Sequence, residues 1–272
     1  MNWRQNKQME LKYRRSLQRV NKKIMDAIKG LQTVGQINSA LRKIANSKMF
    51  QTLANSIANK FVTSANIIDA QTWRDAARAG SKSKKIYEAL QKTLNTHIGR
   101  TVDQQILKNA KLIKTLPITL SKELTNFIGT KTFEGIRPEE IAVTLEGKIF
   151  QYTHAKANTI ARTESSKAMT ALTEARSKDV GVYWYVWKSS KDQRVRNAHK
   201  HMQDVLVRFD DPPSPEALVG EKDVGKYNAG NIYNCRCFPR PLISLENVNW
   251  PCKVYYNGSI TSMSKLQFQN II

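Results

Sequence analysis

The chain has 272 residues, of which 40% are hydrophobic, and a formal net charge of +22 at pH 7. That hydrophobic content excludes a wholly disordered chain, and no stretch reaches the roughly 20 consecutive apolar residues of a membrane span. Three cysteines, two of them in Cys235-Arg236-Cys237, predict a reducing compartment such as bacterial cytoplasm. We expect no signal peptide, because no apolar segment follows Met1–Lys7.

The positive charge is concentrated in the first part of the chain. Residues 1–120 contain 23 Lys and Arg against six Asp and Glu, so this part carries +17 of the total. A polyanion is the simplest partner for such a surface, and nucleic acid is the simplest polyanion. The alternatives are a lysine-rich surface that keeps the protein soluble and an acidic membrane surface, for which aromatic and lipid-anchor signals are lacking.

Proline and apolar spacing predict that the first half of the chain is helical. Residues 1–116 contain no proline, and apolar side chains recur at spacings of three and four from Tyr13 to Leu31. Further helices are expected over about 39–61, 65–79 and 85–116, after Ser121, and from Pro138. The residues expected to contact nucleic acid lie on the first helix and in the basic loop after residue 79: Lys12, Arg14, Arg15, Arg19, Lys22, Lys23, Lys82, Lys84 and Lys85.

The pattern changes from about Tyr152. Small residues over 155–178 favour a helix, and the β-branched and aromatic run 182–187 favours a strand buried on both faces. Later elements are expected to be a short helix over 192–202, a loop over 209–230, and strands over 232–243 and 253–256. The fold class is therefore α+β: a basic helical region 1–150, a small mixed α+β domain 151–245, and an extension 246–272.

His199, Cys235 and Cys237 form a candidate metal site. One imidazole and two thiolates provide three of the four ligands of a tetrahedral zinc site. The fourth ligand would be Cys252, Asp204, another carboxylate or water. His201 would point about 200° away from His199 on a regular helix, so it cannot share the ion. The alternative interpretation, in which the cysteines are small buried residues and His199 hydrogen-bonds a loop carbonyl, stays open.

Charged residues near this group are expected to act as a structural clamp. Asp192 and Arg196 would pair on one helical face, and Arg162 with Glu164 would form a partly buried salt bridge to the 192–199 segment. The catalytic alternatives are a cysteine nucleophile with a histidine base and a zinc hydrolase that uses Glu164. We expect no catalytic residues, because paired carboxylates, a glycine-rich phosphate loop and a His-Glu-x-x-His motif are absent from the sequence.

Several pieces in fixed order resemble the Mu F-like phage head morphogenesis family. They run from Ala161-Arg162-Thr163-Glu164 through the aromatic run that ends at Trp187 to Asp192-x-Arg194-x-Arg196-x-x-His199-x-x-Met202. They continue with Asp210-Asp211-Pro212-Pro213-Ser214-Pro215 and end in Asn231-Ile232-Tyr233-Asn234-Cys235-Arg236-Cys237. The resemblance covers about residues 150–243. One departure is Gln203-Asp204, where the family pattern leads us to expect an acidic residue followed by glycine.

The resemblance implies a minor capsid protein of a tailed bacteriophage, located inside the head near the portal and active in head assembly, DNA packaging or DNA ejection. The implied partners are the portal protein, double-stranded DNA bound without sequence preference, and scaffold or major capsid protein, with no membrane. The protein would be in the host cytoplasm during assembly and later in the virion. Such proteins are not generally enzymes.

Two alternatives remain. One is a metal-dependent hydrolase or an ADP-ribosyltransferase-like effector, although the 29 or so residues after residue 243 are expected to be too few for an added domain. The other is a scaffold that does not contact DNA.

Overall fold

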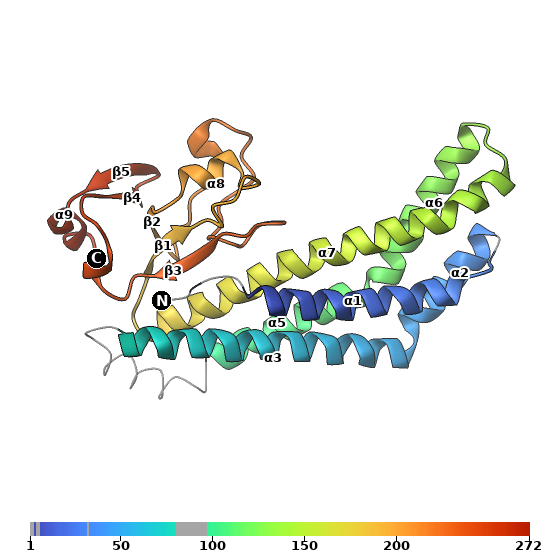
Figure 1. Ribbon diagram of the computed structural model, residues 1–272, viewed down its shortest axis with the longest axis horizontal. Helices are drawn as coiled ribbons and strands as arrows, with labels where there is room; N and C mark the ends of the chain where they lie inside the picture. The colour runs from blue at the N-terminus through green and yellow to red at the C-terminus, as the bar shows by residue number, and fades with distance from the viewer. Residues whose placement is uncertain (1–2, 4–5, 32, 80–96) are drawn as a thin grey trace. The chain divides into compact units, whose positions relative to one another are not determined.

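Helices dominate the first 180 residues of the computed structural model, which describes residues 3, 6–31, 33–79 and 97–272 (Figure 1). Within the described part of the chain, no helix is long and apolar enough to cross a membrane. The helices are α1 (Lys7–Ile28), α2 (Val34–Asn46), α3 (Lys48–Ala79), α5 (His97–Lys114), α6 (Leu116–Phe133) and α7 (Pro138–Asp179).

The predicted helix boundaries near residues 47 and 62 are wrong. The helix expected over 39–61 is interrupted at Ser47, whose hydroxyl accepts a hydrogen bond from the backbone N–H of Phe50 and caps the start of α3. Beyond that point α3 continues through residues 62–64 and joins two helices expected to be separate. The predicted start at Pro138 is confirmed, and α7 then runs without a break as far as Asp179.

The C-terminal part contains a five-stranded mixed sheet with strand order β3-β1-β2-β4-β5. The pair β2 and β4 is parallel, and the other three neighbouring pairs are antiparallel. With the helical first part, this sheet confirms the α+β class. The strands and the two short helices around them are β1 (Trp184–Lys188), α8 (Asn197–His201), β2 (Leu206–Arg208), β3 (Phe238–Pro241), β4 (Cys252–Tyr256), β5 (Ser259–Met263) and α9 (Lys265–Gln269).

Strand β1 is buried on both faces, as its composition predicts. Tyr185 and Trp187 pack into one apolar cluster, which also contains Cys235 and Cys237. Trp184 and Val186 point into a second cluster with Phe268 of α9. Successive side chains of a strand leave opposite faces, so each cluster covers one side of the sheet.

The described chain forms two compact units. The sheet unit contains Met1–Asn6, Ser64–Asp103 and Arg162–Ile272, and the helical unit contains Lys7–Thr63 and Gln104–Ala161. Helices α3 and α7 contribute residues to both units. The predicted division at residue 150 falls inside α7, and that division stays a prediction.

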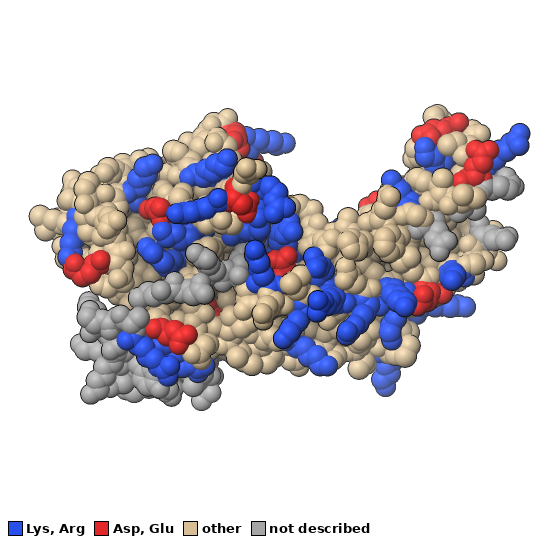
Figure 2. Space-filling view, in the orientation of Figure 1, with Lys and Arg blue, Asp and Glu red and all other residues tan. Residues whose placement is uncertain are grey.

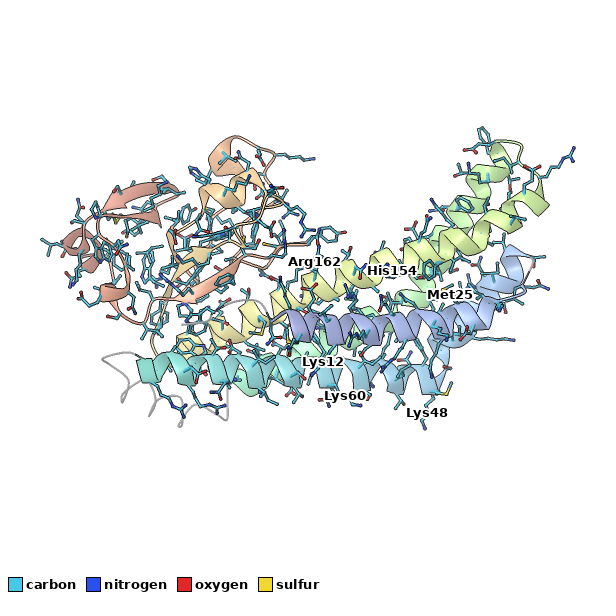
Figure 3. All side chains as sticks on the ribbon, in the orientation of Figure 1. Lys12, Met25, Lys48, Lys60, His154 and Arg162 are labelled. Atoms are coloured by element: carbon cyan, nitrogen blue, oxygen red, sulfur yellow. The ribbon has the colours of Figure 1, made fainter. Side chains whose placement is uncertain are left out.

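In the helical unit, α1 is anchored by polar contacts as well as by its apolar face. The ring of Tyr13 stacks on Phe61 with centroids 3.9 Å apart, and its hydroxyl donates to Asn109 Oδ1 at 3.0 Å. Asn21 donates from Nδ2 to the carbonyl of Thr153 at 2.7 Å. These contacts fix the rotation of α1, so the opposite face of the helix has a defined orientation towards solvent (Figure 3).

In the sheet unit, a buried ion pair joins α3 to α7. Arg176 pairs with Asp69, and the side chains of both are at most 3% exposed. Thr173 donates to the same carboxylate at 2.6 Å, and Arg176 also bonds Asn66. Burial raises the pKa of Asp69 despite the neighbouring guanidinium. The carboxylate is therefore costly to bury and depends on its partners.

Candidate metal centre and basic face

The cysteines lie on a turn that we call the cysteine loop, residues 231–237. The strand expected over 232–243 begins only at Phe238, where β3 starts. Asn234 has a φ of +54°, a left-handed conformation that asparagine tolerates better than most residues. This reversal allows Cys235 and Cys237 to lie buried side by side, although they do not belong to a regular strand.

His199 comes from α8, which is shorter than predicted. The helix expected over 192–202 is wrong at its start, since α8 begins at Asn197 with Arg196 as its N-cap residue. The side chain of Asp192 accepts a hydrogen bond from the backbone N–H of Arg194 at 2.9 Å. This local bond closes a turn in place of a helical one, so Asp192 and His199 do not share a helical face.

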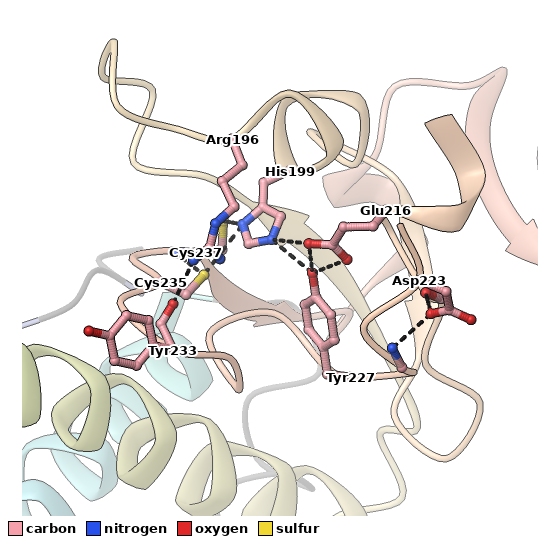
Figure 4. A network of polar contacts seen from close by, with 10 residues as sticks. Arg196, His199, Glu216, Asp223, Tyr227, Tyr233, Cys235 and Cys237 are labelled. Carbon is pink, nitrogen blue, oxygen red and sulfur yellow. Dashed lines mark hydrogen bonds and ion pairs between the residues drawn. The ribbon is translucent and has the colours of Figure 1, made fainter. Parts of the chain in front are cut away.

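The three predicted ligands are brought together. His199 Nδ1 lies 3.5 Å from Cys235 Sγ and 3.4 Å from Cys237 Sγ, and the three ligand atoms all lie within 4.8 Å of one another (Figure 4). His201 is exposed. Cys252 lies on β4 and packs at the second apolar cluster, where burial raises its pKa to about 11. Of the described residues, His199, Cys235 and Cys237 therefore make up this group.

The other ring nitrogen of His199 faces a hydrogen-bonded pair of residues that the sequence analysis did not identify. His199 Nε2 lies 2.9 Å from the hydroxyl of Tyr227, which donates to the carboxylate of Glu216 at 2.7 Å. A hydroxyl that donates to Glu216 accepts from Nε2–H, which leaves Nδ1 with its lone pair facing the thiols. Burial and the Glu216 carboxylate raise the pKa of Tyr227, so this hydroxyl keeps its proton. Both residues lie in the loop 209–230, whose conformation cannot be predicted from the spacing of its residues.

The two thiols are unequal. The hydrogen bond from Cys237 lowers the pKa of Cys235. The reciprocal interaction raises the pKa of Cys237, and burial adds to the rise. The two thiols therefore differ in acidity, and Cys235 loses its proton more readily than Cys237.

Charged residues fasten the cysteine loop to the rest of the sheet unit. Arg162 donates to Asn234 Oδ1 at 3.0 Å, and Arg196 donates to the carbonyl of Tyr233 at 2.9 Å. Arg236 binds Asp192 with both terminal nitrogens, one of them at 2.7 Å. This pair holds the pKa of Asp192 down to about 2.

The expected partners within the clamp are therefore corrected. Asp192 pairs with Arg236 and not with Arg196, since the turn at 192–195 replaces the expected helix. Arg162 donates to Asn234 of the cysteine loop, and its salt bridge to the 192–199 segment stays a prediction. Glu164 is buried, and its Oε2 has no hydrogen-bond partner among the described residues.

Gly230 allows the cysteine loop to lie against α7. A Cβ atom at Gly230 would stand 2.7 Å from Thr170 Oγ1 and 2.8 Å from Ser166 Oγ. Its φ of +88° also favours glycine. Thr170 donates to the carbonyl of Ala229 at 2.8 Å, which ties the two segments directly. The small side chains of Ser166 and Thr170 therefore allow the close approach of this loop.

The turn at Gln203-Asp204 accounts for the departure from the family pattern. Asp204 has a φ of +66°, a conformation that glycine adopts without strain. Gln203 Oε1 accepts from both the backbone and the hydroxyl of Ser189, at 2.9 and 2.7 Å. Asp204 pairs with Lys188 and lies outside the group of candidate ligands.

A second feature, the basic face of α1, lies in the helical unit. We give this name to Lys12, Arg15, Arg19, Lys22 and Lys23, which are all exposed. At 100° per residue they span an arc of about 100°, on the far side of the helix from its buried residues. Asp26 shares this arc. Figure 2 shows Lys and Arg side chains gathered over α1 and α3.

The remaining residues predicted to contact DNA do not belong to the basic face. Arg14 lies beside the buried side of α1 and is half-buried. Lys82, Lys84 and Lys85 lie outside the described residues. On α3, the helical unit also presents exposed Lys48 and Lys60 (Figure 3).

Residues 123–239 match the family model described as Phage Mu protein F like protein. The match covers less than half of the 272 residues, and over that part the chain is similar to the Mu F-like phage head morphogenesis family. The matched segment includes all three candidate ligands and the whole cysteine loop.

One relative adds a longer alignment. A Haemophilus influenzae protein described as uncharacterized is 26% identical over 245 residues, which cover 89% of this chain and 50% of that protein. The chain thus spans about half the length of the curated relative it matches. No solved structure matches the chain significantly.

Proposed function

We propose that this Mu F-like chain is a minor head protein, located inside the phage head near the portal, where it contacts packaged DNA through the basic face of α1. The family match supports a role in phage head morphogenesis. The observation that carries the DNA contact is the clustering of five exposed Lys and Arg residues on one side of a helix whose rotation is fixed by internal contacts.

The charge of α1 suits phosphate contact without base recognition. The helix contains seven Lys and Arg and two acidic residues. Lys and Arg on a convex helix surface neutralise phosphates and release counterions, which gives affinity regardless of sequence. A protein that handles a whole genome during packaging or ejection needs contact of this kind.

The sheet unit would serve as the rigid body that docks to the portal, scaffold or major capsid protein. The cysteine loop and neighbouring turns are held in place by the hydrogen bonds that Arg162, Asp192 and Arg196 make. A loop held in this way has a single shape, which is what a docking surface in an assembled head requires.

We propose a structural role in preference to an enzymatic one. Cys235 and His199 would be the natural nucleophile and base, yet they are 3% and 2% exposed. A reactive thiol has to reach its substrate, and known reactive cysteines are partly exposed. The burial of this pair supports a role in holding the fold.

The DNA contact is tested by binding the full chain to duplexes of unrelated sequence over a salt series. We expect similar affinities for all duplexes and a linear fall of log K with log salt. Changing Lys12, Arg15, Arg19 and Lys22 to Gln should lower the affinity and flatten the salt slope.

A matched control removes the same charge from the sheet unit, by changing the exposed residues Arg194, Lys200, Lys222 and Lys253 to Gln. This variant should keep most of the affinity. Equal losses in the two variants would mean that net charge alone is responsible. Binding that is absent or insensitive to salt would reject the DNA contact.

A further inference from the structure

We propose that His199 Nδ1, Cys235 Sγ and Cys237 Sγ bind one zinc ion, with a water molecule as the fourth ligand. The ion would link α8 to the cysteine loop. The proposal does not depend on the DNA contact, because it concerns a different unit of the molecule.

The two nitrogen-to-sulfur distances are those of a zinc site. Zinc bonds of about 2.3 Å to sulfur and about 2.0–2.1 Å to nitrogen, at a tetrahedral angle, separate nitrogen from sulfur by about 3.6 Å. His199 Nδ1 lies 3.5 and 3.4 Å from the two sulfur atoms. An ion therefore fits between them with little movement of the side chains.

The imidazole is oriented for coordination. Nε2 faces the hydroxyl of Tyr227 at 2.9 Å, and that hydroxyl is fixed by Glu216. A histidine ligand usually donates its second ring N–H to a neighbour of this kind, which fixes the ring and raises the basicity of the coordinating nitrogen. Tyr227 and Glu216 are positioning residues for the site.

The donor set selects zinc over the harder cations. Two sulfur atoms and one imidazole suit Zn²⁺, whereas Mg²⁺ and Ca²⁺ require oxygen ligands. The three residues are buried, and aromatic rings adjoin the histidine: the Trp187 and Tyr227 centroids lie 5.8 and 5.9 Å from that of His199. Such surroundings limit solvent access to the metal.

We assign the fourth zinc ligand to water because the other side chains considered as ligands lie elsewhere. Cys252 packs at the second apolar cluster, across the sheet from the group. Asp204 pairs with Lys188, and Glu216 lies at the Nε2 edge of the ring, 3.7 Å from that atom. Within the described chain, the group of ligand atoms close enough to share an ion stops at three.

The zinc content of the full chain, purified without chelators, tests the proposal. We expect about one zinc ion per chain. After replacement by Co²⁺, thiolate-to-cobalt charge-transfer bands and the strong visible bands of a tetrahedral site should appear. Changing Cys235 or Cys237 to Ser, or His199 to Asn, should remove these bands and the bound zinc.

Cys252→Ser is the matched control, because it removes a thiol from the same unit but from the other side of the sheet. It should keep the full zinc content and the cobalt spectrum. Tyr227→Phe retains all three ligands and should weaken zinc binding by about 10- to 100-fold, measured by competition with a chromophoric chelator.

A folded wild-type chain that contains no zinc and shows no thiolate bands with Co²⁺ would overturn the proposal, whatever the variants do. So would rapid alkylation of Cys235 in the zinc-supplemented native protein, which would instead indicate an accessible nucleophile. Zinc retained by both cysteine variants would also count against these ligands.

Discussion

The surroundings of the cysteine loop and the basic face of α1 both contain several charged residues, yet these residues are used in opposite ways. Around the loop, Arg162, Arg196 and Arg236 bind partners within the sheet unit. On α1, by contrast, the five side chains of the basic face are exposed, while Tyr13 and Asn21 make internal contacts. Charged side chains that bind partners within the fold maintain its shape, whereas exposed charged side chains are available to another molecule.

The largest effect should come from the buried pair on α3 and α7. Asp69→Ala leaves the Arg176 guanidinium buried without its carboxylate, so the free energy of unfolding should fall by about 3–5 kcal/mol. Asp75→Ala removes an exposed carboxylate from the same helix, where its partner Arg78 is 3.8 Å away, and should cost less than about 0.5 kcal/mol. Chemical denaturation measures both. Equal losses in the free energy of unfolding would contradict the expected difference between the buried and the exposed ion pair.

The next effect concerns the approach of the cysteine loop to α7. Gly230→Ala combines a positive φ with a Cβ that would lie 2.7 Å from Thr170 Oγ1, and it should cost about 2–4 kcal/mol. Gly220→Ala has a similar φ of +74° but nothing within 4 Å of the new atom, so it should cost about 1–2 kcal/mol. Thermal unfolding compares the two, and indistinguishable midpoints would contradict the close approach.

A smaller effect separates two neighbouring arginines of α1. Arg15 belongs to the basic face, whereas Arg14 is half-buried beside the apolar side of the helix. Arg15→Gln should reduce the slope of log K against log salt for duplex DNA by about 1, and Arg14→Gln should leave the slope nearly unchanged. The reverse result would mean that another face of α1 meets the DNA.

The smallest effect is the pH dependence of the Asp192–Arg236 pair. The folded pKa of Asp192 is about 2, below its unfolded value of about 3.9, so the pair stabilises the fold above pH 4 and loses its effect as pH falls towards 2. The carboxylate is 35% exposed, and solvent screening limits the contribution to about 1 kcal/mol. Asp192→Asn should flatten this part of the stability profile, measured by denaturation between pH 2 and 6. An unchanged profile would contradict the pairing.

Much of this architecture follows from the sequence because it depends on regular spacing. The buried face of α1 repeats every three or four residues, and the unbroken apolar run of β1 predicts a strand covered on both sides. The candidate ligands were identifiable because one histidine and two cysteines offer zinc-type donors, although 36 residues separate His199 from Cys235.

The rest depends on local bonds and on contacts that spacing does not encode. The side chain of Asp192 closes a turn where a helix was expected, and Asn234 reverses the chain ahead of Cys235. Glu216 and Tyr227 reach His199 from an irregular loop. A positive φ at a residue other than glycine, as at Asn234 and Asp204, is set by its surroundings and is hard to predict from one sequence.

We propose above all that this chain is a component of the phage head that lies beside the DNA. Quantitative mass spectrometry of purified virions and of DNA-free heads, from a phage that encodes the chain, tests it most directly. We expect the protein in both kinds of particle at a few copies per portal, and expect ultraviolet light to cross-link α1 peptides to DNA in the filled heads. Absence from both particles, with the protein present in the infected cell, would contradict the claim.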